Sequence, residues 1–188
     1  MARVVLFYKP YGVICQFSPS AGKPTLKEYL PITGVYPAGR LDTDSEGLLV
    51  LTDEGGLQHA ISHPVKKWPK AYWVQVENVP DASAVTRLRN GLRVGAFVTA
   101  PALVREIDEP PGLPERLPPI RVRKAIPTHW LDITLSEGKN RQIRRMTAAV
   151  GLPTLRLIRY RIGHWTLEGL APGQFRLLSS QEMAMRWS

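Results

Sequence analysis

The sequence of 188 residues predicts a fold that mixes helices and strands. Short apolar or alternating segments, such as residues 48–52 and 70–77, are typical of β-strands. Capping residues followed by helical apolar spacing indicate helices between them, most clearly over residues 140–150. The hydrophobic fraction of 44% and the charged fraction of 22% are typical of a soluble globular protein. A chain of this length forms one domain or two intimately packed subdomains.

The expected elements follow one another along the whole chain. Strands are expected over residues 4–8, 35–36, 48–52, 70–77, 131–135, 155–161 and 174–178, with a hairpin or two short strands over 92–106. Helices are expected over residues 25–30, 57–62, 81–90 and 140–150, and a last one from residue 179. Thr25 and Glu28 have capping-box spacing, while Asp81 suits a helix start and Gly91 a helix stop. Residues 108–119 contain five prolines and predict a surface loop.

The basic charge is large and unevenly distributed. The formal net charge of +9 and the isoelectric point near 10.0 favour a polyanion partner, most often nucleic acid. Ten basic residues against two acidic ones lie between residues 121 and 161. On the helix expected at 140–150, Arg141, Arg144 and Arg145 share a face turned away from the apolar stripe. A solvated face is the usual fate of surface arginines, but the helix contains no acidic residue, which favours phosphate binding.

Residues 39–52 place a polar cluster directly before a short apolar strand. Gly39 and Gly47 bracket the cluster and permit tight turns, and reactive carboxylates are commonly held on such loops. Asp42 is therefore the expected chemical group. Arg144 lies nearest the edge of the apolar stripe, and an arginine that turns inward needs a carboxylate, for which Asp42 is the candidate.

The residues of this loop are also typical of two other structures. The acidic spacing approximates an EF-hand, but Asp53 stands where a bidentate Glu is expected and the flanks do not indicate two amphipathic helices. Alternatively, Asp44 and Ser45 cap a turn while Asp42 only accepts bonds from backbone amides.

Several classes of protein are disfavoured. The single cysteine, Cys15, excludes an internal disulfide and is expected to be a buried thiol. His59 and His63 have a spacing that can bind metal, but no third ligand is apparent, so no metal site is expected. The N-terminus lacks the features of a signal peptide, and no apolar segment approaches the roughly 20 residues needed to span a bilayer. The expected location is the cytoplasm.

The motifs resemble those of the RsuA-type ribosomal pseudouridine synthases. Residues 39–52 resemble the signature loop of that family, residues 9–13 its first motif, residues 70–74 its Lys-x-Tyr-x-Val strand, and residues 137–146 its third motif. Residues 155–163 resemble the strand that follows. These motifs begin close to residue 4, so the family's separate N-terminal RNA-binding domain is expected to be missing here. Residues 35–42 and 153–160 add likeness to the large-subunit branch.

This resemblance implies an α+β fold, with a mixed, mostly antiparallel sheet, flanking helices and two subdomains around a cleft. Residues 1–188 would form a single catalytic domain. The activity would be the isomerisation of a uridine in RNA to pseudouridine, with no cofactor or metal. The target uridine would be flipped out of folded RNA at a cost of a few kcal/mol. A monomer is expected, because RNA should occupy the basic face and no long heptad pattern is present.

The resemblance also implies site residues. Asp42 matches the catalytic aspartate, acting as a nucleophile at C1′ or as a base on a sugar proton. Arg144 matches its basic partner, and Tyr72 matches the tyrosine that packs on the base, although it could be an ordinary strand aromatic. Arg40 resembles the arginine that fills the vacated position. The expected phosphate contacts are Lys139, Arg141, Arg145 and Arg159, with Lys9 and Lys70.

Two further alternatives share these motifs. One is a catalytically silent factor that binds ribosomal RNA or assists ribosome assembly on the same scaffold. The other is the same isomerase acting on small-subunit ribosomal RNA or transfer RNA. Charge supports the silent factor and the enzyme equally, whereas the complete set of Asp42, Tyr72 and Arg144 favours the enzyme.

Overall fold

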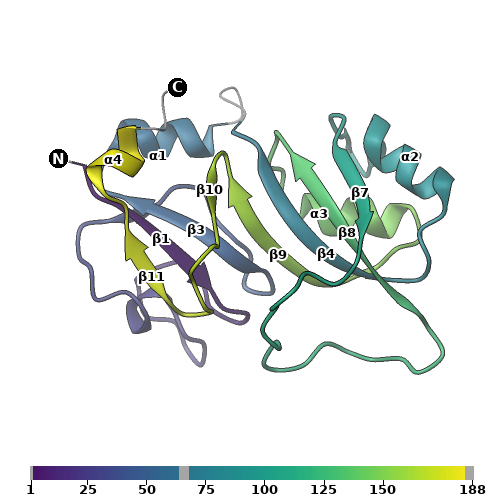
Figure 1. Ribbon diagram of the computed structural model, residues 1–188, viewed down its shortest axis with the longest axis horizontal. Coiled ribbons are helices and arrows are strands. Elements are labelled where there is room, and N and C mark those ends of the chain that lie inside the picture. The colour runs from purple at the N-terminus through teal and green to yellow at the C-terminus, as the bar shows by residue number, and fades with distance from the viewer. Residues whose placement is uncertain (1, 64–67, 185–188) are drawn as a thin grey trace. The chain divides into compact units, whose positions relative to one another are not determined.

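The computed structural model describes residues 2–63 and 68–184 (Figure 1). The chain divides into two compact units. The first unit comprises Met1–Trp68 and Arg161–Ser188, and the second comprises Pro69–Tyr160. The first unit is therefore built from both ends of the chain, whereas the second is one continuous segment.

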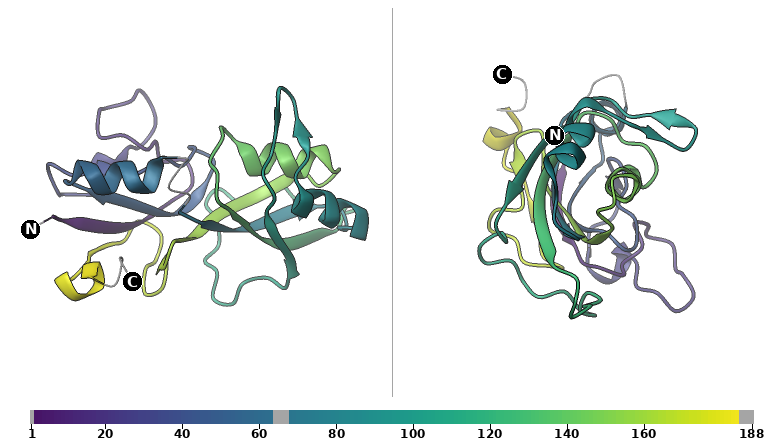
Figure 2. Two further views of the ribbon diagram at one scale, coloured as in Figure 1. Left: turned by 90° about the horizontal axis from the view of Figure 1, so that it is seen from above. Right: turned by 90° about the vertical axis from the view of Figure 1, so that its right-hand side faces the viewer.

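The first unit is organised around two adjacent antiparallel strands, β1 (Val4–Lys9) and β3 (Glu46–Thr52). β11 (Phe175–Leu177) pairs with the free side of β1, and β2 (Tyr36–Pro37) pairs with part of β3. Every residue of β1 and β3 is buried, which explains their nearly unbroken apolar sequences. α1 (Gly55–Ser62) and α4 (Ser180–Ala184) lie on opposite sides of β1 (Figure 2).

The helix expected over residues 25–30 is only a single 3-10 turn, Leu26–Glu28. The predicted capping box is present: the Glu28 carboxylate accepts a bond from the Thr25 backbone N–H at 3.0 Å. The expected length was wrong because Pro31 disfavours a helical conformation in the residue before it, which leaves too few residues for an α-helix.

The second unit is an antiparallel arrangement of long strands with two helices. β4 (Lys70–Glu77) pairs with β8 (Thr128–Leu135), which pairs in turn with the edge strand β7 (Leu103–Ile107). β9 (Thr154–Ile162) lies next to β4. Its last two residues, Arg161 and Ile162, already belong to the first unit, where they pair with β10 (Trp165–Thr166). β5 (Arg93–Val94) and β6 (Phe97–Val98) form a separate short hairpin.

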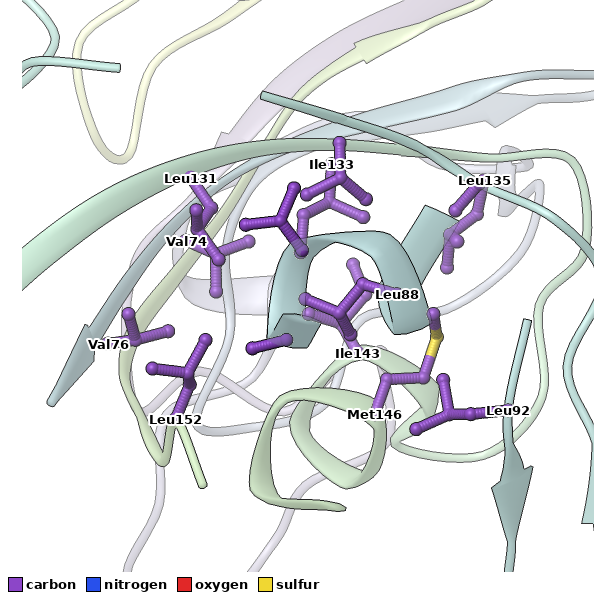
Figure 3. Close-up of a cluster of buried hydrophobic side chains, with 14 of the residues drawn as sticks. Val74, Val76, Leu88, Leu92, Leu131, Ile133, Leu135, Ile143, Met146 and Leu152 are labelled. Atoms are coloured by element: carbon purple, nitrogen blue, oxygen red, sulfur yellow. The ribbon is translucent and has the colours of Figure 1, made fainter. Parts of the chain in front are cut away.

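The core of the second unit lies between its sheet and its helices, α2 (Ala82–Asn90) and α3 (Gln142–Ala149) (Figure 3). Val74, Leu131 and Ile133 project from the strands toward Leu88 of α2 and Ile143 of α3. The predicted helix boundaries hold closely here. The Asp81 side chain accepts a bond from the Ala84 backbone N–H at 2.6 Å, and Gly91 follows α2 with a φ of 85°.

The proline-rich segment has no regular structure, as predicted, and continues to the start of β8. Its path is fixed by arginines. Arg116 donates to the carbonyl of Pro119 at 2.8 Å, and Arg156 of β9 donates to the carbonyl of Pro114 at 2.9 Å. Among the described residues, no helix is both long and apolar enough to cross a membrane.

The core of the second unit makes a simple prediction about stability. Leu131→Ala removes a side chain that is fully buried, and it should lower the free energy of unfolding by about 2–5 kcal/mol. The same substitution at Leu103, which is 73% exposed, should cost less than about 0.5 kcal/mol. Chemical denaturation of both variants measures the difference. Equal losses would contradict this placement of the core.

Candidate functional site

The loop before β3 holds Asp42 in a constrained backbone. The backbone N–H of Ala38 donates to Val50 of β3 at 2.8 Å, and Gly39 takes a left-handed φ of 85°. The Leu41 side chain is buried, whereas the next side chain, the carboxylate of Asp42, is half-buried and partly accessible. The loop is thus held against a rigid strand, as the sequence predicted.

The first motif is attached directly to this loop. The Gly12 backbone N–H donates to the Thr43 carbonyl at 2.8 Å, and the Ser45 N–H donates to the Asp42 carbonyl at 3.1 Å. Ser45 and Glu46 are buried beside them. β3 begins at Glu46, only four residues after Asp42. Most of the residues that an EF-hand loop would use therefore form a strand, and the element before them, β2, is not a helix, so the calcium interpretation stays rejected.

Lys9 is a fully buried lysine beneath this loop. Its ammonium group donates to the carbonyls of Pro10 at 2.9 Å and of Val13 at 2.8 Å. Burial lowers the pKa of Lys9 from 10.5 to about 8, against the opposing effect of the nearby carboxylates of Glu46, Asp44 and Asp42. Because it is buried, Lys9 is better suited to supporting the acidic loop than to contacting phosphate, the role expected from the sequence.

Tyr72 and Lys70 lie on β4 in the second unit. Tyr72 is half-buried and packs against the core cluster, and it stands opposite Ile133 of β8. Burial, together with the charge of Arg159, lowers the pKa of Lys70 to about 8. Arg159 itself is buried on β9, 3% exposed. Two cations therefore lie close together on this sheet, one of them still partly accessible.

The three arginines around α3 have different environments. Arg144 is half-buried with an inaccessible Nε, which agrees with its expected place at the edge of the core stripe. Arg145 is exposed on the helix. Arg141 precedes the helix in a left-handed conformation with a φ of 49°, so it does not share the helical face predicted for it. The helix begins only at Gln142, whose side chain accepts a bond from the Lys139 backbone N–H at 3.0 Å.

The remaining predicted residues are exposed. Arg40 lies at the surface in the first unit, two residues before Asp42. Lys139 is exposed in the second unit, and both it and Arg145 contact the β5–β6 hairpin, a role for which the sequence held no evident signal. Asp42, Arg40 and Lys9 thus belong to the first unit, and the other predicted residues to the second. The pairing of Asp42 with Arg144 stays a prediction.

The described residues contain no group of three or more His, Cys, Asp or Glu side chains placed to hold a metal ion. His59 and His63 lie together at the end of α1 with ring centroids 4.4 Å apart. Cys15 is buried as a free thiol, as expected.

Comparison with known proteins places these motifs in a family. The model of the family described as RNA pseudouridylate synthase matches residues 3–149. The chain belongs to the RNA pseudouridylate synthase family. The match spans the first motif, the Asp42 loop, the Tyr72 strand and α3, so the resemblance inferred from the sequence is confirmed.

Individual relatives agree with this assignment. The chain is 55% identical to the ribosomal large subunit pseudouridine synthase E of Xanthomonas axonopodis pv. citri, over 90% of each protein. It is 50% identical to the Vibrio vulnificus protein of the same name, over 94% of this chain and 75% of that protein. It is 31% identical to the ribosomal large subunit pseudouridine synthase B of Bacillus subtilis, over 95% of this chain and 68% of that protein.

A solved structure supports the same fold. A crystal structure of a pseudouridylate synthase superposes with a TM-score of 0.77 at 26% identity, over 98% of this chain and 73% of that one. The predicted fold class, an α+β pseudouridine synthase fold with a mostly antiparallel sheet, is therefore confirmed.

The buried Lys9 of this family member predicts a pH dependence of stability. Below pH 8 the lysine is charged in both states, and the folded state bears the cost of burying the charge. Between about pH 8 and 10.5 the folded state holds the neutral amine while the unfolded state still binds a proton, so stability should rise with pH. The gain over this interval should approach about 3 kcal/mol.

Lys9→Met removes this titration and supplies the comparison. The difference in free energy of unfolding between the wild type and this variant, measured by denaturation from pH 7.5 to 10.5, should change in favour of the wild type. Titrations shared by both proteins, including that of Lys70, cancel in the difference. A constant difference across the interval would show that Lys9 titrates at its ordinary pH.

Proposed function

We propose that this protein isomerises a specific uridine of large-subunit (23S) ribosomal RNA to pseudouridine. The observation that carries the proposal is its 55% identity, over 90% of each chain, to a protein named ribosomal large subunit pseudouridine synthase E. Residues 1–188 act as a single catalytic domain and as a monomer, in the cytoplasm, where bacterial ribosomal RNA is made.

The reaction exchanges one bond for another within a single nucleotide. The bond between C1′ of the ribose and N1 of uracil breaks, and a bond between C1′ and C5 forms. The proton leaves C5 and a proton is gained at N1, so no atom is added and no cofactor is consumed. Asp42 attacks C1′ or removes a sugar proton, and either step requires an ionised carboxylate at the edge of a partly desolvated loop.

The surroundings of Asp42 support this role. The carboxylate is half-buried on a loop held by the Ala38 amide and the first motif, so its position is restricted before substrate binds. We assign Arg144 as its guanidinium partner and Tyr72 as the ring that packs on the target base. Both residues are half-buried in the second unit, which suits side chains that support a reacting group.

RNA binding is assigned to the basic residues. Arg40 is exposed two residues from Asp42 and fills the position that the flipped nucleotide leaves. Lys139, Arg141 and Arg145 are exposed and contact phosphates. Lys70, which is half-buried, contacts a single phosphate of the target strand, and the buried Arg159 beside it adds positive charge at that position. These contacts offset the cost of removing a base from its stack, a few kcal/mol.

Asp42→Asn tests the chemistry. The substitution keeps the shape of the side chain and removes its charge, so pseudouridine formation should fall by about four orders of magnitude or more. Affinity for an in vitro transcript of large-subunit ribosomal RNA should remain nearly intact. Mapping pseudouridines in the treated transcript measures the first effect, and filter binding measures the second.

The matched control is Asp44→Asn, which removes a neighbouring half-buried carboxylate of the same loop. It should retain most of the activity. If wild-type protein binds this RNA but forms no pseudouridine in it, the silent RNA-binding factor is the better assignment. If the modified uridine lies in small-subunit or transfer RNA instead, the proposed isomerisation is supported and the proposed large-subunit target is wrong.

The phosphate contacts predict a salt dependence. Removing Arg145 by substitution to Ala should weaken RNA binding and make the slope of log affinity against log salt concentration shallower by about one unit. Equilibrium binding measured between low and physiological salt gives this slope. Arg87→Ala, which removes an exposed arginine of α2, serves as the control and should leave the slope unchanged. An unchanged slope for the Arg145 variant would return that residue to the solvated surface.

A further inference from the structure

The β5–β6 hairpin carries an aromatic ring that contacts two of the basic residues assigned to RNA binding. The Lys139 ammonium lies 4.3 Å from the ring centroid of Phe97, and the Arg145 guanidinium carbon lies 4.7 Å from it. Figure 2 shows the hairpin segment beside α3, the helix that carries Arg145. Cations at such distances are attracted by the negative face of an aromatic ring.

Each cation is also bonded to the hairpin backbone. The Lys139 ammonium donates to the Val98 carbonyl at 3.0 Å, and an Arg145 Nη2 donates to the Val94 carbonyl at 3.3 Å. Gly95 at the hairpin turn has a φ of 60°, and a Cβ at that position would lie 2.7 Å from Arg145 Nη2. Because Gly95 has no side chain, the turn leaves room for the guanidinium of Arg145.

This arrangement neutralises only part of the charge. Two positive groups beside one ring repel each other, and of the two only Lys139 has an ion-pair partner among the described residues, Glu137 Oε2 at 3.4 Å. The other oxygen of Glu137, Oε1, accepts bonds from the Ala100 amide at 2.8 Å and from the Gln142 side chain. A ring and two carbonyls hold the cations in place, while their remaining N–H groups can donate to another acceptor.

We propose that Phe97 is a positioning residue for RNA binding, which holds Lys139 and Arg145 in the orientation that contacts adjacent phosphates. The inference rests on the proposed function, in which these two residues bind RNA. Long basic side chains lose rotamer freedom when they bind, and a side chain already ordered by a ring and a carbonyl has lost much of it beforehand. RNA binding would then also relieve the repulsion between the two cations.

The alternative is that Phe97 only anchors the hairpin by apolar packing, since it packs partly buried against the core cluster. Phe97→Leu separates the two roles, because it keeps apolar volume and removes the aromatic face. Phe97→Tyr keeps the face and should bind RNA as the wild type does. The matched control is Phe175→Leu, a partly buried phenylalanine of the first unit's core. Thermal melting of each variant reports on folding.

Filter binding of an in vitro transcript of large-subunit ribosomal RNA is the test. Phe97→Leu should raise the dissociation constant about fivefold, since two exposed cation–π contacts are lost, and should raise KM rather than lower kcat. Combined with Arg145→Ala, it should weaken binding by clearly less than the product of the two single effects. Phe175→Leu should leave binding unchanged.

Any one of the following results would overturn the inference. The first is that Phe97→Leu binds RNA as tightly as the wild type. The second is that the fold-change in dissociation constant caused by Phe97→Leu multiplies in full with those of Arg145→Ala and Lys139→Ala. The third is that Phe97→Tyr loses as much RNA affinity as Phe97→Leu. If Arg145→Ala and Lys139→Ala both bind RNA normally, these cations do not contact phosphate, and the inference fails with that part of the proposed function. Loss of pseudouridine formation alone, with the binding cycle intact, would count against the proposed chemistry and leave Phe97 as a positioning residue.

Discussion

The ammonium group of Lys9 lies inside the first unit, bonded to two carbonyls of the turn that follows its own strand. A buried charge of this kind costs free energy unless neighbouring groups offset it. Here the offset comes from the carbonyls and from the negative charges of the loop that contains Asp42. The first motif and the Asp42 loop are therefore coupled electrostatically as well as through the bond between Gly12 and Thr43. Without this cation, the carboxylates of the acidic loop would repel one another.

In the second unit, positively charged side chains are in excess. Cations are gathered on β4, β9 and the start of α3, and several of them are partly or fully buried. Lys70 responds to this excess with a lowered pKa, because both burial and Arg159 disfavour its charge. Such a surface stores unfavourable electrostatic energy that a polyanion relieves, which raises association rates and affinity together. Carbonyl groups and the Phe97 ring keep the cations ordered until that partner binds.

Local signals were sufficient to predict most elements of this fold. The alternation of residues 70–77 predicted both ends of β4, Lys70–Glu77, and Asp81 and Gly91 predicted the ends of α2, because these signals act within a few residues. The shortened helix after Thr25 and the left-handed Arg141 were missed. In both places the cause is local, namely Pro31 after the first turn and the bond between Gln142 and Lys139 that starts α3 late, but apolar periodicity alone does not reveal it.

The residues of the candidate site that stand in family motifs could be predicted from the sequence, whereas features that depend on tertiary packing could not. Asp42, Tyr72 and Arg144 stand in family motifs, so their importance could be inferred from spacing and resemblance. Phe97 stands in no such motif, and its contacts join segments more than forty residues apart, which no local pattern encodes. Lys9 also stands in a motif, but its burial depends on the packing of β1, which the motif does not show.

The division of residues between the two units also bears on how the reaction would be organised. Asp42 and Arg40 belong to the first unit, whereas the exposed cations proposed to contact phosphate belong to the second. Phosphate contacts act on every nucleotide alike, so they hold the RNA without selecting the step at C1′. Only groups that interact more strongly with the transition state than with bound RNA accelerate that step. Because Asp42 and the cations proposed to bind phosphate are different side chains, substitutions in the cation set should act mainly on affinity and substitutions of Asp42 mainly on rate.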